Sequence, residues 1–126
     1  MVLSRLLEPP DLVVATVRDF VTLEDQQDVV SFVRNSIATV GSVRLLIHFE
    51  QFAGWVLNGE RNRLWLRDDE GVSRIAVVIA RHSRHAVETV IARALRHLPI
   101  AFFETDAAAR RWLEAPTPHA AHATST

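Results

Sequence analysis

Apolar residues are arranged along the chain in two ways, as short continuous runs and as longer stretches with helical spacing. The continuous runs predict strands buried on both faces, because a strand covered on one face alternates apolar and polar residues. Runs of this kind occupy Leu12–Val17, Val43–Phe49 and Arg74–Ala80, and a shorter one occupies Ile100–Phe103. Met1–Leu7 is expected to pair back along the first of these runs as an edge strand.

Three stretches carry apolar residues at helical spacing, and each has a local start or stop signal. The first begins after Thr22, which stands three residues before Asp25 as in a capping box, and ends at Gly41. The second covers 86–98, and the third begins after Thr105, a residue that can cap it. Strands that alternate with helices in this order predict an α/β fold with a mainly parallel sheet covered on both sides.

The segment from Trp55 to Gly71 has two interpretations. Its pattern fits a helix interrupted by Gly59, and it also fits a strand over Arg63–Arg67 that turns at 69–71 into the next strand. We favour the helix, because the crossover between two buried parallel strands is usually helical.

The composition is that of one soluble domain of 126 residues, with 48% hydrophobic and 23% charged side chains. All 14 basic residues are arginine, and the chain has neither lysine nor cysteine. These gaps exclude Schiff-base lysine chemistry, a thiol nucleophile, thiolate metal sites and the lysine of a phosphate-binding loop. The formal net charge of −1 argues against a nucleic-acid-binding protein, which is usually plainly basic.

No segment resembles a membrane or targeting element. The longest apolar run, Ile75–Ala80, is far shorter than the roughly 20 residues that span a bilayer. The N-terminal residues lack the apolar core of a signal peptide, so we expect a cytoplasmic protein. Prolines and small residues dominate 115–126, which predicts a disordered tail after a domain that covers 1–114.

Several of these segments, taken in order, form a recognisable series. Thr22–Asp25 opens the first helix, Arg44–Phe49 is followed by Phe52–Trp55, and Ala108–Leu113 closes the series with Trp112-Leu113. From about Leu12 to Leu113 the chain resembles the SpoIIAA-like, or STAS-like, family of small bacterial proteins. The resemblance implies an α/β, STAS-like sandwich of four to five mainly parallel strands with helices packed on the sheet. It also implies a fold similar to that of anti-sigma-factor antagonists and CRAL-TRIO lipid carriers.

One departure from the family bears on function. The antagonists that the chain resembles carry a phosphorylatable serine at the start of the helix after the second buried strand. The matching segment here, Glu50–Trp55, contains neither serine nor threonine. A phosphorylation switch at that position is therefore chemically excluded.

A group of large apolar side chains follows the carboxyl end of a predicted buried strand. Ligands bind at this end of open α/β sheets, and small-molecule pockets are commonly lined by aromatic residues. We therefore predict a site for a small apolar or lipid-like ligand made of Phe49, Phe52, Trp55, Leu64 and Trp65. The alternative is that these side chains form a satellite core that holds a helix on the sheet.

Other candidate chemistry is weaker. His82, His85 and Glu88 surround a helix start, but their spacing lets only two of them share a face, and no third metal ligand is evident. The sequence has no nucleophile elbow and no nucleotide-cradling glycine loop. We predict a non-catalytic binding module without metal or cofactor. The alternative is a protein–protein adaptor, including a homodimer formed through an exposed edge strand or the aromatic patch.

Overall fold

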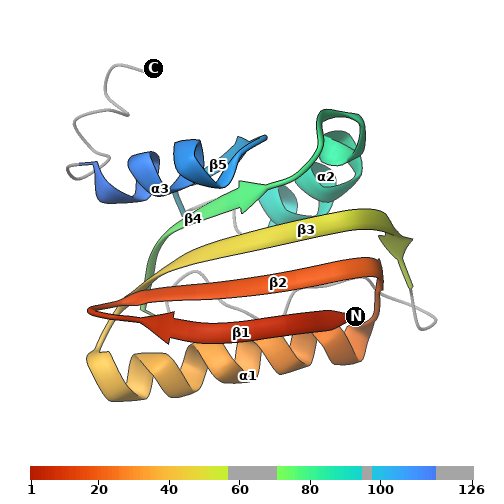
Figure 1. Cartoon of the computed structure of the whole chain (residues 1–126). Helices are drawn as coiled ribbons and strands as arrows, with labels where there is room; N and C mark the ends of the chain where they lie inside the picture. The colour runs from red at the N-terminus through yellow and green to blue at the C-terminus, as the bar shows by residue number, and fades with distance from the viewer. Residues whose placement is uncertain (57–70, 95–97, 116–126) are drawn as a thin grey trace.

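The computed structural model describes residues 1–56, 71–94 and 98–115 of the chain (Figure 1). Within these ranges the elements follow one another as β1 (Val2–Glu8), β2 (Leu12–Val21), α1 (Leu23–Val40), β3 (Val43–Trp55), β4 (Val72–Val78), the 3-10 helix η1 (Arg81–Ser83), α2 (Arg84–Ala94), β5 (Ile100–Phe103) and α3 (Asp106–Glu114).

The strands form one sheet in the order β1-β2-β3-β4-β5, so strands that are consecutive in the chain are neighbours in space (Figure 1). β2 to β5 are parallel to one another, and β1 runs antiparallel along β2 with Leu6 opposite Val14. The predicted mainly parallel α/β sheet with an N-terminal edge strand is thus confirmed.

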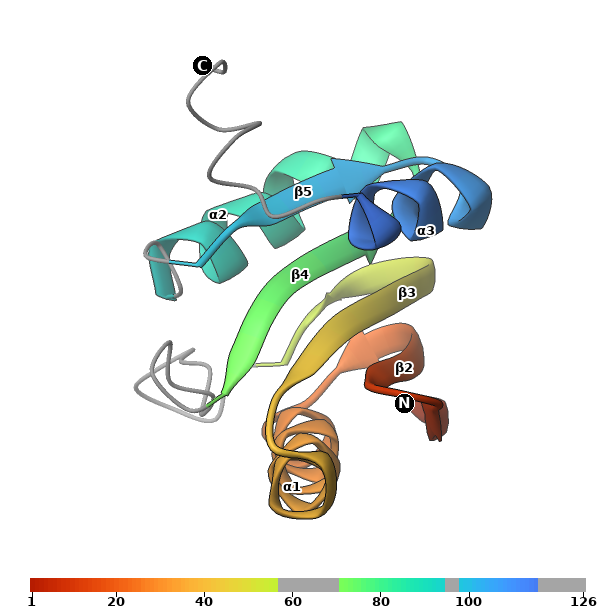
Figure 2. The same cartoon turned by 90° about the vertical axis from the view of Figure 1, so that its left-hand side faces the viewer.

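Helices cover both faces of the sheet, and each face has its own apolar cluster (Figure 2). On one face α1 and α2 pack against the strands through Val33 and Val87. On the other face α3 packs through Ala109 and Leu113. This burial from two sides explains why β2, β3 and β4 contain continuous apolar runs rather than alternating patterns.

Both predicted helix caps are present. The Thr22 hydroxyl accepts a hydrogen bond from the Asp25 N–H at 3.0 Å, and the Asp25 carboxylate accepts one from the Thr22 N–H at 2.8 Å. α1 ends at Gly41, whose φ of +98° is strained for any residue with a Cβ. At α3 the Thr105 hydroxyl accepts from the Ala108 N–H at 3.2 Å.

β3 continues to Trp55, beyond the predicted strand Val43–Phe49, so Glu50–Trp55 is strand and not the helix start that the resemblance to the antagonists implies. The segment stays in the sheet because β2 also continues, so that Phe20 lies opposite Gly54 and Val21 opposite Trp55. The pairing is irregular where Asp19 and Gln51 adopt positive φ angles of 60° and 49°. The two interpretations of 55–71 concern mainly 57–70, outside the described residues, and the predicted tail from 116 onward lies outside them too.

Candidate functional site

Three of the predicted ligand-binding residues form a cluster of aromatic rings at the end of β3. Phe49, Phe52 and Trp55 meet edge to face, with ring centroids 5.4 to 6.0 Å apart. Phe49 is buried, the other two are half-buried against the core under α1 and α2, and the Trp55 indole N–H donates to the Ala86 carbonyl at 3.2 Å. These contacts join β3 to α2, as the satellite-core alternative expects. Leu64 and Trp65 lie outside the described residues, so the ligand-binding role of the set stays a prediction.

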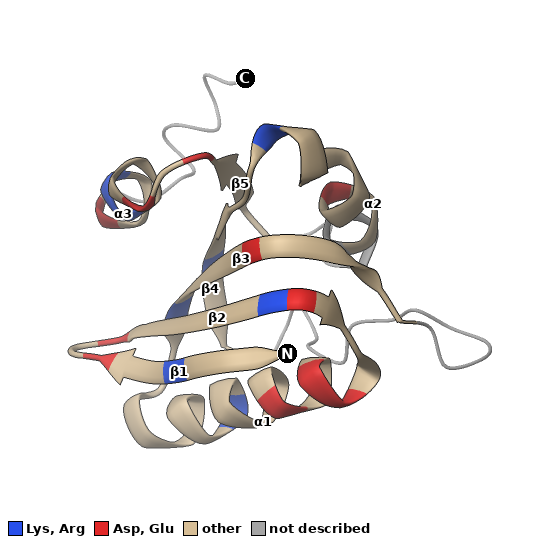
Figure 3. Cartoon of the chain, turned by 45° about the vertical axis from the view of Figure 1, so that its right-hand side comes forward, with Lys and Arg blue, Asp and Glu red and all other residues tan. Residues whose placement is uncertain are grey.

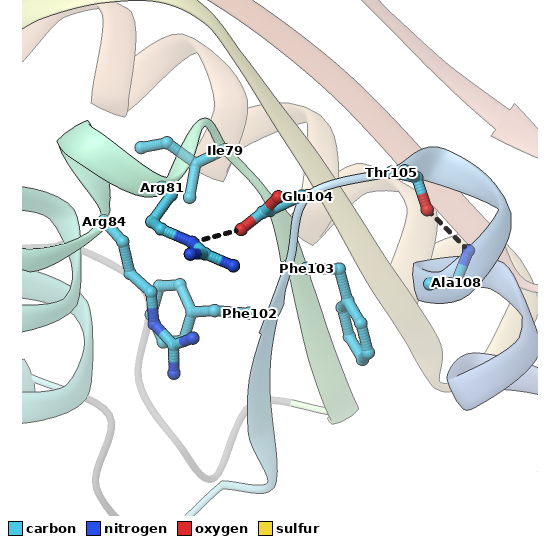
Figure 4. A pocket seen from close by; sticks show the side chains of 8 residues that line it. All are labelled: Ile79, Arg81, Arg84, Phe102, Phe103, Glu104, Thr105 and Ala108. Carbon is cyan, nitrogen blue, oxygen red and sulfur yellow. Dashed lines mark hydrogen bonds and ion pairs between the residues drawn. The ribbon is translucent and has the colours of Figure 1, made fainter.

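A cleft of about 700 Å³ opens at the carboxyl ends of β4 and β5 (Figure 4). It lies between the start of α2 and the start of α3, and its lining residues are Ile79, Arg81, Arg84, Phe102, Phe103, Glu104, Thr105 and Ala108. The carboxyl edge of a parallel sheet is where ligands bind in open α/β folds. The predicted ligand site lies at the end of β3, whereas this cleft lies at the ends of the next two strands, β4 and β5.

Local backbone contacts explain why these residues meet. The Ile79 N–H donates to the Phe103 carbonyl at 2.9 Å, which keeps the exit of β4 beside the end of β5. The chain then turns through η1, where the Ser83 N–H bonds to the Ala80 carbonyl at 3.0 Å. This turn carries Arg81 and Arg84 to the side of β5.

The cleft has an apolar floor that belongs to both layers of the molecule. Successive residues of a strand face opposite sides of the sheet. Accordingly, Phe102 packs with the core under α1 and α2, and Phe103 packs with the cluster under α3. Ile79, which is only 2% exposed, and Ala108 of α3 complete the apolar surface.

Two arginine side chains reach across this floor toward β5 (Figure 4). Arg81 Nε donates to Glu104 Oε2 at 2.9 Å, and both side chains are mostly exposed. The Arg84 guanidinium lies over the Phe102 ring at 5.3 Å from its centroid, and Arg84 Nε is 3.5 Å from Glu88 Oε1. The cleft therefore combines aromatic surface with two cations whose carboxylate partners, within the described ranges, are largely open to solvent.

A polar network behind the cleft fixes the first turn of α3. Arg110 donates to Asp106 Oδ2 at 2.7 Å and to both oxygens of Glu8 at 2.9 and 3.2 Å, while Asp106 Oδ1 lies 2.6 Å from His48 Nε2. The Arg110 hydrogen bonds lower the pKa of Glu8. Burial alone would raise the pKa of Asp106, but its hydrogen bonds from His48 and Arg110 outweigh burial and hold that pKa below its ordinary value. The network ties α3 to β1 and β3.

The described residues contain no group of three or more His, Asp or Glu side chains arranged to hold a metal ion. His82 lies in η1, and His85 and Glu88 lie on α2. Among the helices that the structure describes, none is long and apolar enough to cross a membrane.

Comparison with known proteins identifies the fold. The family model for SpoIIAA-like proteins matches residues 12–114. The crystal structure of an uncharacterized DUF3478-family protein with a SpoIIAA-like fold, from Shewanella loihica PV-4, superposes with a TM-score of 0.61 at 17% identity. That match covers 90% of this chain and 92% of the other, whereas no curated protein matches. The family match extends from the start of β2 to the end of α3, so the chain belongs to the SpoIIAA-like family.

Proposed function

We propose that this protein is a non-catalytic binding module that holds a small molecule with a mainly apolar body in the cleft at the ends of β4 and β5. The observation that supports the proposal is the cleft itself. Its volume of about 700 Å³ lies within the roughly 300–1,000 Å³ of small-molecule sites. Phe102, Phe103 and Ala108, which are partly exposed, offer the apolar contacts that such a molecule needs.

The polar groups around the cleft favour binding over catalysis. The Thr105 hydroxyl already accepts a hydrogen bond as the α3 cap, and guanidinium groups stay protonated near neutral pH and so cannot act as general bases. His48 is paired with Asp106, which Arg110 also holds. This carboxylate therefore serves the attachment of α3 to the sheet.

The test uses phenylnaphthylamine, a neutral apolar probe that fluoresces when bound, together with native mass spectrometry and solvent extraction of freshly purified protein. Ala108→Phe places a ring in the cleft and is expected to weaken probe binding by at least about tenfold, or roughly 1.4 kcal/mol. Ala107→Phe is the matched control, because Ala107 is exposed on the same helix and does not line the cleft.

The two variants should differ only in binding, which thermal denaturation of each protein checks. Protein that is purified empty and binds no probe contradicts the proposal. Equal binding by both variants contradicts the location of the site. The residues Phe49, Phe52 and Trp55 at the end of β3 would then be the next candidate site.

A protein–protein adaptor is the second candidate function, and the exposed edge of β1 favours it. β1 pairs with β2 on one side and has no strand on its other side in the described part of the chain. Leu3 and Leu6 are 42% and 43% exposed along it. An open edge with apolar side chains can pair with a strand from another chain.

A further inference from the structure

The charges of the cleft indicate the chemical class of its ligand, an inference that rests on the proposed binding function. Arg81 and Arg84 stand in η1 and at the start of α2, where Arg81 reaches toward Glu104 and Arg84 lies over Phe102 (Figure 4). Guanidinium groups are planar donors that match the paired oxygens of carboxylate, phosphate and sulfonate groups. Two of them beside the aromatic rings of Phe102 and Phe103 provide the contacts for a molecule that is anionic at one end and apolar at the other.

The contact between Arg81 and Glu104 is weak enough to be replaced. The two side chains are 87% and 55% exposed, and water screens such pairs so strongly that they add little stability. Glu104 therefore occupies the place where the oxygens of a ligand would meet Arg81.

The Phe102 ring contacts Arg84 on one side and leaves the N–H donors of Arg84 available to a ligand. Its guanidinium lies over the Phe102 ring, which restricts the plane of the group without using its N–H donors. Its contact with Glu88 is long, at 3.5 Å, and both side chains are about half exposed. A ligand could therefore bind Arg84 without first breaking a buried hydrogen bond.

We propose that the cleft binds a small anionic amphiphile, whose anionic group displaces Glu104 from Arg81 and contacts Arg84, and whose apolar body lies against Phe102 and Phe103. Glu104 is then an internal competitor for the ligand.

The test compares anilinonaphthalene sulfonate with phenylnaphthylamine, two fluorescent probes that differ by one sulfonate group. The wild-type protein should bind the anionic probe about tenfold more tightly, the effect of one charge-assisted hydrogen bond at a half-exposed site. Arg81→Gln combined with Arg84→Gln should remove this preference and leave the affinity for the neutral probe within about twofold. Arg111→Gln, which removes a charge from α3 outside the cleft, should change neither affinity.

Glu104→Gln makes the opposite prediction. It removes the competitor and should tighten binding of the anionic probe severalfold at low salt, with less effect at high salt because the charges are exposed. If this variant binds the anionic probe no better than the wild type, Glu104 is not a competitor.

The outcomes separate this inference from the function on which it rests. Equal affinity of the wild-type protein for both probes contradicts the anionic ligand class and leaves the binding function standing. If neither probe binds, the proposed function fails as well. Should the double arginine variant not fold, the wild-type preference and its loss at high salt decide the question.

Discussion

At the scale of single residues, Arg110 has an effect beyond its own helix. Its guanidinium bonds to Glu8 at the end of β1 and to Asp106 in the first turn of α3, and Asp106 in turn meets His48 of β3. The hydrogen bond with Glu8 raises the pKa of Arg110, so this group stays charged. One side chain therefore links the first turn of α3 directly to β1 and, through Asp106, to His48 of β3.

Arg110→Met removes these hydrogen bonds and keeps most of the length of the side chain. We expect the free energy of unfolding to fall by about 1–2 kcal/mol, because three partly exposed charge-assisted hydrogen bonds are lost and water replaces them only in part. Urea denaturation measures the change. Arg111→Met, one residue further along α3 and exposed, should stay within about 0.5 kcal/mol of the wild type. Equal effects of the two substitutions would count against the network.

At the scale of elements, β1 is attached differently on its two sides. Arg5 of β1 pairs with Asp28 of α1 at 2.8 Å and lies over the Phe32 ring at 5.9 Å. Leu6 points to the other face of the sheet, where α3 packs on the later strands, and is 43% exposed. The strand is thus secured to the core on one face while its outer edge and part of its other face stay accessible.

The adaptor function predicts that the protein self-associates through this strand as its concentration rises. Leu6→Lys should then reduce dimer formation, because a buried ammonium at the new interface would lose its hydration. Light scattering over a range of concentrations measures the effect. Val40→Lys is the matched control, since Val40 is 39% exposed at the far end of α1. A wild-type protein that stays monomeric and captures no partner argues against the adaptor.

At the scale of the whole molecule, charged side chains affect the stability of the fold through local pairs. The formal net charge is −1, and Figure 3 shows acidic and basic positions interspersed over the described elements. Three of the carboxylates join segments that are distant in sequence or cap a helix. Burial would raise the pKa of Asp25, but hydrogen bonds with Thr22 and with the Met1 ammonium group outweigh burial and lower it. The pKa values of Glu8 and Asp106 are lowered as well.

These lowered pKa values predict loss of stability in acid. A carboxylate with a depressed pKa in the folded state stabilises the fold above its unfolded pKa, and this contribution disappears as the pH falls through the folded value. The ordinary values are 4.5 for Glu8 and 3.8 for Asp25 and Asp106. The urea midpoint should therefore be steady above about pH 5 and decline below about pH 4.5. Glu8→Gln should flatten the upper part of this decline, and a midpoint that is unchanged at pH 3 would contradict the argument.

The fold was largely predictable because its signals lie within single segments of the sequence. Strands buried on both faces appear as apolar runs, and Thr22 and Thr105 mark helix starts within one turn. The extension of β3 was not predictable from its own residues. Glu50 and Gln51 interrupt the apolar run, since this part of the strand is exposed, and it stays in the sheet because β2 continues beside it.

The cleft depends on strand neighbours, which the sequence shows only indirectly. Arg81 and Arg84 follow one buried strand, and Glu104 follows another. The sequence therefore shows that charged side chains follow both strands. Only the pairing of β4 with β5, with Val78 opposite Phe103, brings these groups to one opening. The aromatic residues at the end of β3 were more conspicuous in the sequence, but their rings contact one another and the core.

The neighbouring phenylalanines at the end of β5 have a mechanical consequence. Phe102 belongs to the layer under α1 and α2, and Phe103 belongs to the layer under α3. A molecule that contacts both rings would connect the two layers at the edge of the sheet. Occupancy of the cleft would then stiffen the attachment of α2 and α3 together, although these helices lie on opposite faces.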